Sequence, residues 1–289
     1  MAQLILETSS GAELCGGAVI HEEFIITAAH CVENLSQSDF ERLFVVLGST
    51  EIYSNAPKTK RFKVLQIISH KKYNSRKIIN DIALIRIERF GEELVPEFLT
   101  IKRKESTNIG LTAECSVAGF GLTKNYGSTA KVLQAVNVFP MSHNDCNNAW
   151  RPIKEATQLC ALGARVASEL NADSCMGDSG GPLFCRVEKE LQLTGIVSFG
   201  GAKCGDPDRP GVYTRASFYE NWINSMIDEH KTPELQLTTG SIEITTLTPF
   251  LKADDARNTT IKLIVESKTT SSAFITFSSF SLFILACIL

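Results

Sequence analysis

The sequence predicts an all-β domain, a sandwich or a barrel, over about residues 1–230. Short apolar runs recur through this region, and turn-forming residues separate them. Runs of this length and spacing are typical of antiparallel strands. The clearest runs are residues 15–20, 24–29, 44–48, 62–68, 82–87, 115–121, 132–139, 182–187 and 193–199. Residues 1–7 also resemble a strand, one already under way at the first residue.

Two stretches depart from the strand pattern. Residues 142–150 predict a short helix. Residues 217–229 place Phe218, Trp222 and Met226 at helical spacing, which predicts a helix that packs one face on the domain.

The composition changes after residue 230. Residues 231–272 are rich in Thr and Ser and contain no cysteine, so we expect a stalk, with a possible strand at 261–265. Residues 273–289 are uncharged and mostly apolar, and no basic residue follows them. A short apolar tail of this kind suits a signal for a glycosylphosphatidylinositol (GPI) anchor. A spanning helix at the short limit of length, or a free tail, are the alternatives.

Charge and cysteine content limit the classes of protein to which the chain can belong. The 289 residues carry a net charge of −3, which gives no indication of nucleic-acid binding. Eight of the nine cysteines lie between Cys15 and Cys204, which fits an oxidising compartment. Eight cysteines allow about 105 pairings, so their number alone selects none. Residues 1–7 lack the features of a secretion signal. We therefore expect the chain as given to be truncated or to use an alternative start.

The stretch from Gly177 to Gly181 places Ser179 between glycines. Such a turn can aim backbone N–H groups at a developing oxyanion. The same letters fit the G-x-S-x-G turn of α/β-hydrolases, in which the acid and the histidine follow the serine. Here His30 and Asp81 precede Ser179, which is the order of the chymotrypsin group.

Three motifs carry a family resemblance over about residues 1–230. They are T-A-A-H-C around His30, D-I-A-L from Asp81 and D-S-C-M-G-D-S-G-G-P around Ser179. The chain resembles a trypsin/chymotrypsin-fold serine protease, and its S-F-G, C-G-D-P and P-G-V-Y segments look most like the granzyme and mast-cell-type branch. The resemblance implies two six-stranded antiparallel β-barrels, a C-terminal helix and a catalytic cleft between the barrels.

The resemblance also implies roles for the motif residues. His30 would be the general base, Asp81 would orient it, and Ser179 would be the nucleophile. The backbone N–H groups of Gly177 and Ser179 would form the oxyanion hole. Asp178 would pair with a new α-amino group when the enzyme is activated by cleavage.

Asp173 would lie at the base of the primary specificity pocket and select Arg or Lys before the cleaved bond. Gly200 and Gly211 would form the walls of this pocket, Phe199 would be an aromatic platform for the substrate, and Ser198 would also bind the substrate. The resemblance implies the disulfides Cys15–Cys31, Cys115–Cys185, Cys146–Cys160 and Cys175–Cys204.

We expect no cofactor and no metal. Residues 50–60 contain Glu51 as their one acid, unlike a calcium loop, and Pro210 replaces the Tyr of sodium-activated relatives. Expected partners are protein substrates and protein inhibitors, on the cell surface or outside the cell. Asn34 and Asn258 begin glycosylation sequons. The rival function is that of a pseudoprotease, a binding protein on the same fold.

Overall fold

The computed structural model describes residues 1–9, 11–52, 56, 58–90, 110–150, 152–168, 170–187, 190–233, 261–265 and 273–277. The chain divides into two compact units, Met1–Thr232 and Pro233–Leu289. Each unit is treated separately below.

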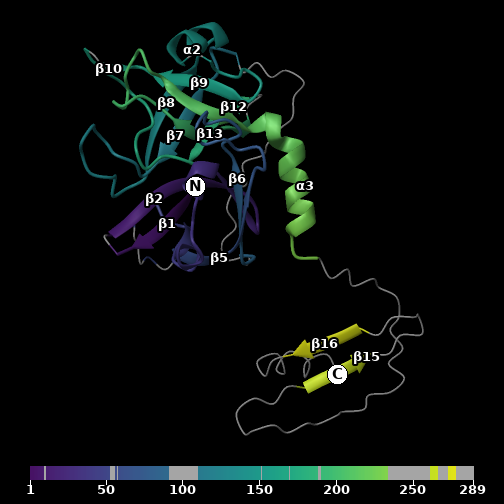
Figure 1. Cartoon of the computed structure of the whole chain (residues 1–289). Helices are drawn as coiled ribbons and strands as arrows, with labels where there is room; N and C mark the ends of the chain where they lie inside the picture. The colour runs from purple at the N-terminus through teal and green to yellow at the C-terminus, as the bar shows by residue number, and fades with distance from the viewer. Residues whose placement is uncertain are drawn as a thin grey trace. The chain divides into compact units, whose positions relative to one another are not determined.

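The first half of unit 1 is a closed antiparallel barrel with the strand order β1-β2-β3-β6-β5-β4. Figure 1 labels β1, β2, β5 and β6 of this barrel. Its strands are β1 (Ala2–Thr8), β2 (Gly11–His21), β3 (Phe24–Thr27), β4 (Leu43–Leu47), β5 (Lys60–Ser69) and β6 (Ala83–Ile87). A 3₁₀ turn, η1 (Ala29–Cys31), follows β3, and the one-turn helix α1 (Gln37–Phe40) precedes β4.

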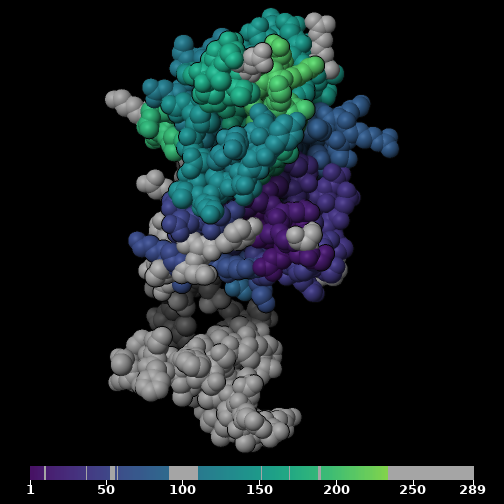
Figure 2. Space-filling model, turned by 90° about the vertical axis from the view of Figure 1, so that its left-hand side faces the viewer, coloured from purple at the N-terminus to yellow at the C-terminus, as the bar shows by residue number. Residues whose placement is uncertain are grey.

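The second half of unit 1 is a second closed barrel, with the order β12-β13-β14-β9-β8-β7. Its strands are β7 (Cys115–Gly119), β8 (Gln134–Pro140), β9 (Gln158–Gly163), β12 (Pro182–Val187), β13 (Glu190–Phe199) and β14 (Gly211–Arg215). In Figure 2 the two halves appear as a purple-to-blue mass and a teal-to-green mass in contact. The predicted all-β fold and the two six-stranded barrels are confirmed.

The predicted helices are present with small shifts of their ends. Helix α2 is His143–Trp150, and the C-terminal helix is a 3₁₀ turn, η3 (Ala216–Tyr219), continued by α3 (Glu220–His230). The apolar runs had not singled out β9, β14 or the small hairpin of β10 (Arg165–Ala167) and β11 (Leu170–Asn171). These strands are short, or mix polar with apolar residues, so their conformation depends on pairing with neighbours.

Alternate residues of strand β6 face two different cores. On β6, Ala83, Ile85 and Ile87 belong to the interior of the first barrel. Leu84, between them, packs with Leu193 and Ile196 of β13. Successive side chains of a strand point to opposite faces, so a strand buried on both faces has no polar alternation.

Four disulfides brace unit 1, in the pairs that the resemblance implies: Cys15–Cys31, Cys115–Cys185, Cys146–Cys160 and Cys175–Cys204. The described part of unit 2 is an antiparallel pair, β15 (Ile261–Val265) and β16 (Ala273–Phe277). The rest of the expected stalk and tail lies outside the described residues. Within the described ranges, none of the helices combines the length and apolar character needed to span a bilayer.

Candidate active site

His30 and Asp81 are brought together by the pairing of β3 with β6. His30 lies in η1, directly after β3, and Asp81 lies just before β6; Thr27 of β3 is paired with Ala83 of β6. The ring Nδ1 of His30 is 2.8 Å from Asp81 Oδ2. The backbone N–H of His30 donates to Asp81 Oδ1 at 2.9 Å. One carboxylate therefore holds both the ring and the backbone of His30.

The second barrel completes the surroundings of Asp81, whose exposed fraction is 1%. Ser198 at the end of β13 donates its hydroxyl to Asp81 Oδ2 at 2.5 Å. Thr214 on β14 donates its hydroxyl to the Asp81 backbone carbonyl at 2.8 Å. Sequence reasoning had placed Ser198 among the substrate-binding residues and had missed these two contacts. Since they join residues more than a hundred positions apart, no local pattern indicates them.

Ser179 lies in a tight turn before β12. Gly177 and Gly180 in this turn have φ values of 96° and 76°, a region that glycine adopts without strain. The Ser179 carbonyl accepts from the backbone N–H of Gly16 at 2.7 Å. Gly16 adjoins Cys15, which is disulfide-bonded to Cys31, the neighbour of His30.

A second contact ties the same turn to the His30 segment. A Cβ on Gly180 would overlap the Thr27 hydroxyl and lie 3.1 Å from the Ala28 nitrogen. The turn thus packs on the residues that lead into η1. Among the interactions of the described residues, none is a hydrogen bond between Ser179 and His30; His30 Nε2 lies 3.8 Å from Cys31 Sγ. The hydrogen bond between a catalytic serine and its histidine is often long in free enzymes.

The carboxylate of Asp178 is held by backbone donors of the second half of unit 1. Its Oδ1 accepts from the Gly121 N–H at 2.7 Å and its Oδ2 from the Cys175 N–H at 2.8 Å. A Cβ on Gly119 would overlap this carboxylate. Burial raises the pKa of Asp178, and the two backbone donors oppose that shift in part. Among the described residues no cationic side chain pairs with it.

Asp173 is another partly buried carboxylate of this region. It accepts from the backbone N–H of Ser174 at 2.7 Å and from that of Gly211 at 3.1 Å. The hydroxyl of Tyr213, a fully buried residue that sequence reasoning missed, lies 3.4 Å from Asp173 Oδ1. Burial raises the pKa of Asp173 to about 6 against these hydrogen bonds. Asp173 and Asp178 both line one cavity of about 420 Å³.

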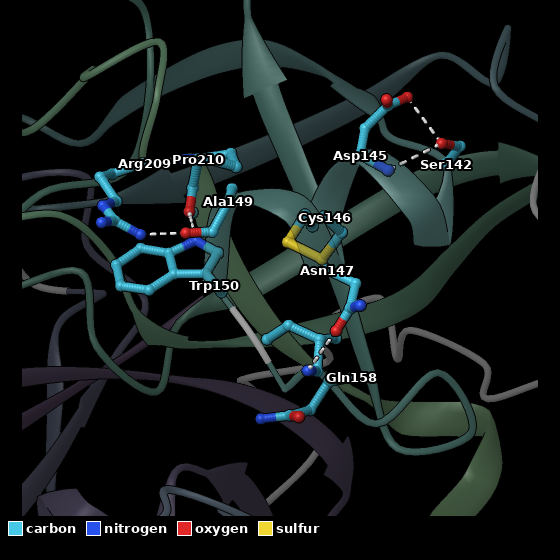
Figure 3. The surroundings of a disulfide bond; sticks show 12 residues. Ser142, Asp145, Cys146, Asn147, Ala149, Trp150, Gln158, Arg209 and Pro210 are labelled. Atoms are coloured by element: carbon cyan, nitrogen blue, oxygen red, sulfur yellow. Dashed lines mark hydrogen bonds between the residues drawn. A yellow bond between two sulfur atoms is a disulfide. The ribbon is translucent and has the colours of Figure 1, made fainter.

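Trp150, the last residue of α2, lies beside Arg209 and Pro210 (Figure 3) and braces the wall of the predicted pocket. Phe199 packs edge-on against Trp150, with ring centroids 5.2 Å apart. The Trp150 indole donates to the Pro210 carbonyl at 2.9 Å, directly before Gly211. Arg209 lies over the Trp150 ring and donates to the Ala149 carbonyl. Through Phe199 and Pro210, Trp150 therefore contacts the end of β13 and the start of β14, the two strands that carry the predicted wall.

Metal-ligand geometry arises once among the described residues, where Cys15, His30 and Cys31 cluster. The two cysteines form a disulfide, so they have no thiolate to offer a metal ion. The cluster is a consequence of the disulfide beside His30.

Paired six-stranded barrels with an Asp-bonded histidine at their junction are the architecture of the two-barrel serine hydrolases. A family model described as Trypsin matches residues 1–223, and the chain belongs to this family of serine proteases. It is 33% identical over 227 residues to coagulation factor XI of Bos taurus, a match that covers 76% of this chain and 35% of that protein. It is 31% identical over 234 residues to chymotrypsin-like elastase family member 1 of Bos taurus, covering 78% of this chain and 84% of the relative.

Proposed function

We propose that the protein is a serine endopeptidase that cleaves peptide bonds after Arg or Lys. The observation that carries this proposal is the buried Asp81 carboxylate, which bonds the ring and the backbone of His30 at 2.8 and 2.9 Å. The glycine turn that presents Ser179 packs on the segment that carries His30.

In the proposed mechanism the Ser179 Oγ attacks the carbonyl carbon of the substrate. His30 Nε2 accepts the serine proton and returns it to the leaving amine, and water then hydrolyses the acyl-enzyme by the same route. Asp81 fixes the His30 tautomer and stabilises the imidazolium. The backbone N–H groups of Gly177 and Ser179 stabilise the oxyanion.

Asp173 gives the proposed specificity. A buried carboxylate with neutral hydrogen-bond donors favours a cationic partner, and an Arg or Lys side chain would supply it. Gly200 and Gly211 leave room for a long side chain, because neither adds a Cβ to the wall. Ser198 and Phe199 complete the site.

Substitution of Ser179 tests the reaction. Ser179→Ala should lower kcat on Arg peptides by about 10⁴-fold or more, and adding His30→Ala should cause little further loss, because the two groups act as a unit. Ser38→Ala, at an exposed serine, is the control and should leave kcat unchanged. Full activity of a folded Ser179→Ala protein would refute the proposal.

A non-catalytic role is the second candidate, and Asp178 is the observation in its favour. Its partly buried carboxylate has backbone N–H groups as its partners among the described residues and no cation, as in an enzyme that awaits activation. We propose that an α-amino group released by cleavage becomes its counter-charge. A fluorophosphonate probe that labels the unvaried chain, but not Ser179→Ala, would contradict the non-catalytic role.

We further propose an extracellular or cell-surface setting. Four disulfides favour an oxidising compartment. Residues 1–230 would form the protease domain, residues 231–272 the stalk and residues 273–289 the membrane tether or its attachment signal. Proteins with an accessible Arg or Lys would be substrates, and protein inhibitors would bind the same cleft.

A further inference from the structure

The loop between β5 and β6 carries an isolated group of positive charges. Its basic residues are Lys71, Lys72, Arg76 and Lys77, and all four are exposed. In the part of the chain that the structure describes, none of them forms an ion pair or a side-chain hydrogen bond. The whole chain carries a net charge of −3, so this positive surface is local. Residues 71–77 are called the cationic loop below.

The backbone of the cationic loop is held in one conformation. The N–H of Tyr73 donates to the His70 carbonyl at 2.8 Å, and the N–H of Lys77 donates to the Asn74 side chain at 3.0 Å. An antiparallel bridge closes the loop between Asn74 and Ile79. The charges therefore project from a preorganised surface, which lowers the entropy cost of binding.

The loop also leads into a strained segment. Ile78 has a φ of 47°, a conformation that a β-branched residue rarely adopts. Strain of this kind persists where surrounding contacts enforce it, and it clusters at functional sites. The Ile78 carbonyl accepts from the Gln158 side chain at 3.0 Å. Since Gln158 is on β9, this bond ties the end of the loop to the second barrel.

The chain limits how far the loop lies from the proposed catalytic centre. Lys77 is four residues from Asp81, so their Cα atoms are at most about 14 Å apart. An extended peptide advances about 3.3 Å per residue. A side chain within about four residues of the cleaved bond is therefore within reach of the loop.

The four charges do not act as a structural ion-pair network. Like charges that lack counter-ions repel one another and lower stability slightly. Burial lowers the pKa of His70, at the base of the loop, and the charge of Lys72 lowers it further. The loop thus maintains a positive potential next to the cleft, which a negatively charged partner would relieve.

We propose that the cationic loop docks acidic side chains of the peptide substrate close to the cleaved bond. This inference rests on the proposed function and adds an acidic flank to the Arg or Lys requirement. Four cations in two adjacent pairs match two or three carboxylates, whereas a long polyanion would need a more extended basic surface. The contacts are exposed, so they act mainly on encounter and weaken with salt.

Binding to the full-length Ser179→Ala chain separates docking from catalysis. Each fluorescent peptide contains one Arg, with two Glu residues either before or after that Arg. Fluorescence anisotropy measures its affinity, which is compared with that of the same peptide carrying Gln in place of Glu. At low salt, one Glu-flanked peptide should bind about three- to tenfold tighter, as expected for a few exposed ion pairs. Arg76→Glu with Lys77→Glu should remove that advantage, as should high salt. The matched control is Lys58→Glu with Lys63→Glu, two exposed lysines outside the loop, and it should keep the advantage.

Each other outcome contradicts the inference. Equal binding of Glu- and Gln-flanked peptides, or equal loss in the control, would overturn it. Heparin fragments that bind through Arg76 and Lys77, without an acidic-peptide advantage, would assign the loop to a sulfated glycan instead. If the reversal variant fails to fold, Arg76→Gln with Lys77→Gln and the salt titration of the Ser179→Ala chain provide the same decision. If the unvaried protein cleaves no Arg or Lys peptide, the proposed function is refuted. That result is separate from the docking result, because docking is measured without turnover.

Discussion

Two carboxylates of the site, the buried Asp81 and the partly buried Asp173, are held in contrasting ways. Asp81 contacts a histidine and accepts from Ser198, so its charge is matched by a group that can itself become cationic. Asp173 accepts mainly from two backbone N–H groups, and no cationic side chain pairs with it among the described residues. This difference fits the roles proposed above, in which Asp81 orients a base and Asp173 recognises a cation.

The raised pKa of Asp173 predicts how cation binding depends on pH. The carboxylate must be ionised to hold a guanidinium or amidinium group, and its pKa is about 6. Benzamidine affinity should therefore rise about tenfold per pH unit below 6 and level off above it. Calorimetry on the unvaried chain and on Asp173→Asn measures this directly. The variant should bind weakly at every pH, and a flat profile in the unvaried chain would contradict the assignment.

The raised pKa of Asp173 also makes the free energy of unfolding depend on pH. Between the ordinary value of 3.8 and about 6, folded Asp173 keeps a proton that the unfolded chain has lost. The free energy of unfolding should therefore fall as pH rises through this window, by on the order of 3 kcal/mol. Asp173→Asn should be more stable than the unvaried chain at pH 7.5, and the difference should vanish towards pH 4. Thermal unfolding at the two pH values is the measurement, and an unchanged difference would exclude burial of this charge as the cause.

At the scale of elements, the C-terminal helical segment supports the residue before Asp81. Asn80 has a φ of 54°, and its amide donates to the Lys72 carbonyl at 2.7 Å. Tyr219, the last residue of η3, is 2% exposed and donates its hydroxyl to Asn80 Oδ1 at 2.9 Å. The segment therefore holds the turn that aims Asp81 at His30.

Removal of this hydroxyl should act on the proposed catalysis. Tyr219→Phe leaves the side-chain oxygen of Asn80, Oδ1, without its donor and should lower the free energy of unfolding by about 1–3 kcal/mol. The looser turn should lower kcat several-fold and leave KM nearly unchanged, because the specificity pocket is untouched. Tyr126→Phe, at a tyrosine that is 92% exposed, is the matched control. An effect on KM alone would contradict the positioning role.

At the scale of the whole molecule, the two barrels share a core. Ile26 and Leu84 of the first barrel pack with Leu193 and Ile196 of the second, and Ile223 of α3 joins them. This shared core lies within unit 1, so the barrels should unfold together. Unit 2 is a separate unit and is the proposed stalk and tether.

The tether gives a prediction for the complete protein. If residues 273–289 are an attachment signal for GPI, the mature protein should lack them and remain at the cell surface. Phosphoinositide-specific phospholipase C should then release it, and mass spectrometry should detect no peptide containing Cys287. Retention after treatment, with Cys287 present, would favour a spanning segment.

The sequence by itself determined the fold class and the order His30, Asp81, Ser179, because turn residues, strand-length apolar runs and local motifs are encoded over a few neighbouring positions. Which buried strand face belongs to which core was decided by the tertiary structure, since residues 82–85 are apolar on both sides. The contacts of Ser198 with Asp81 and of Tyr213 with Asp173 were decided in the same way. Such contacts exist only after barrel closure brings distant strands together, so no local pattern in the chain could specify them.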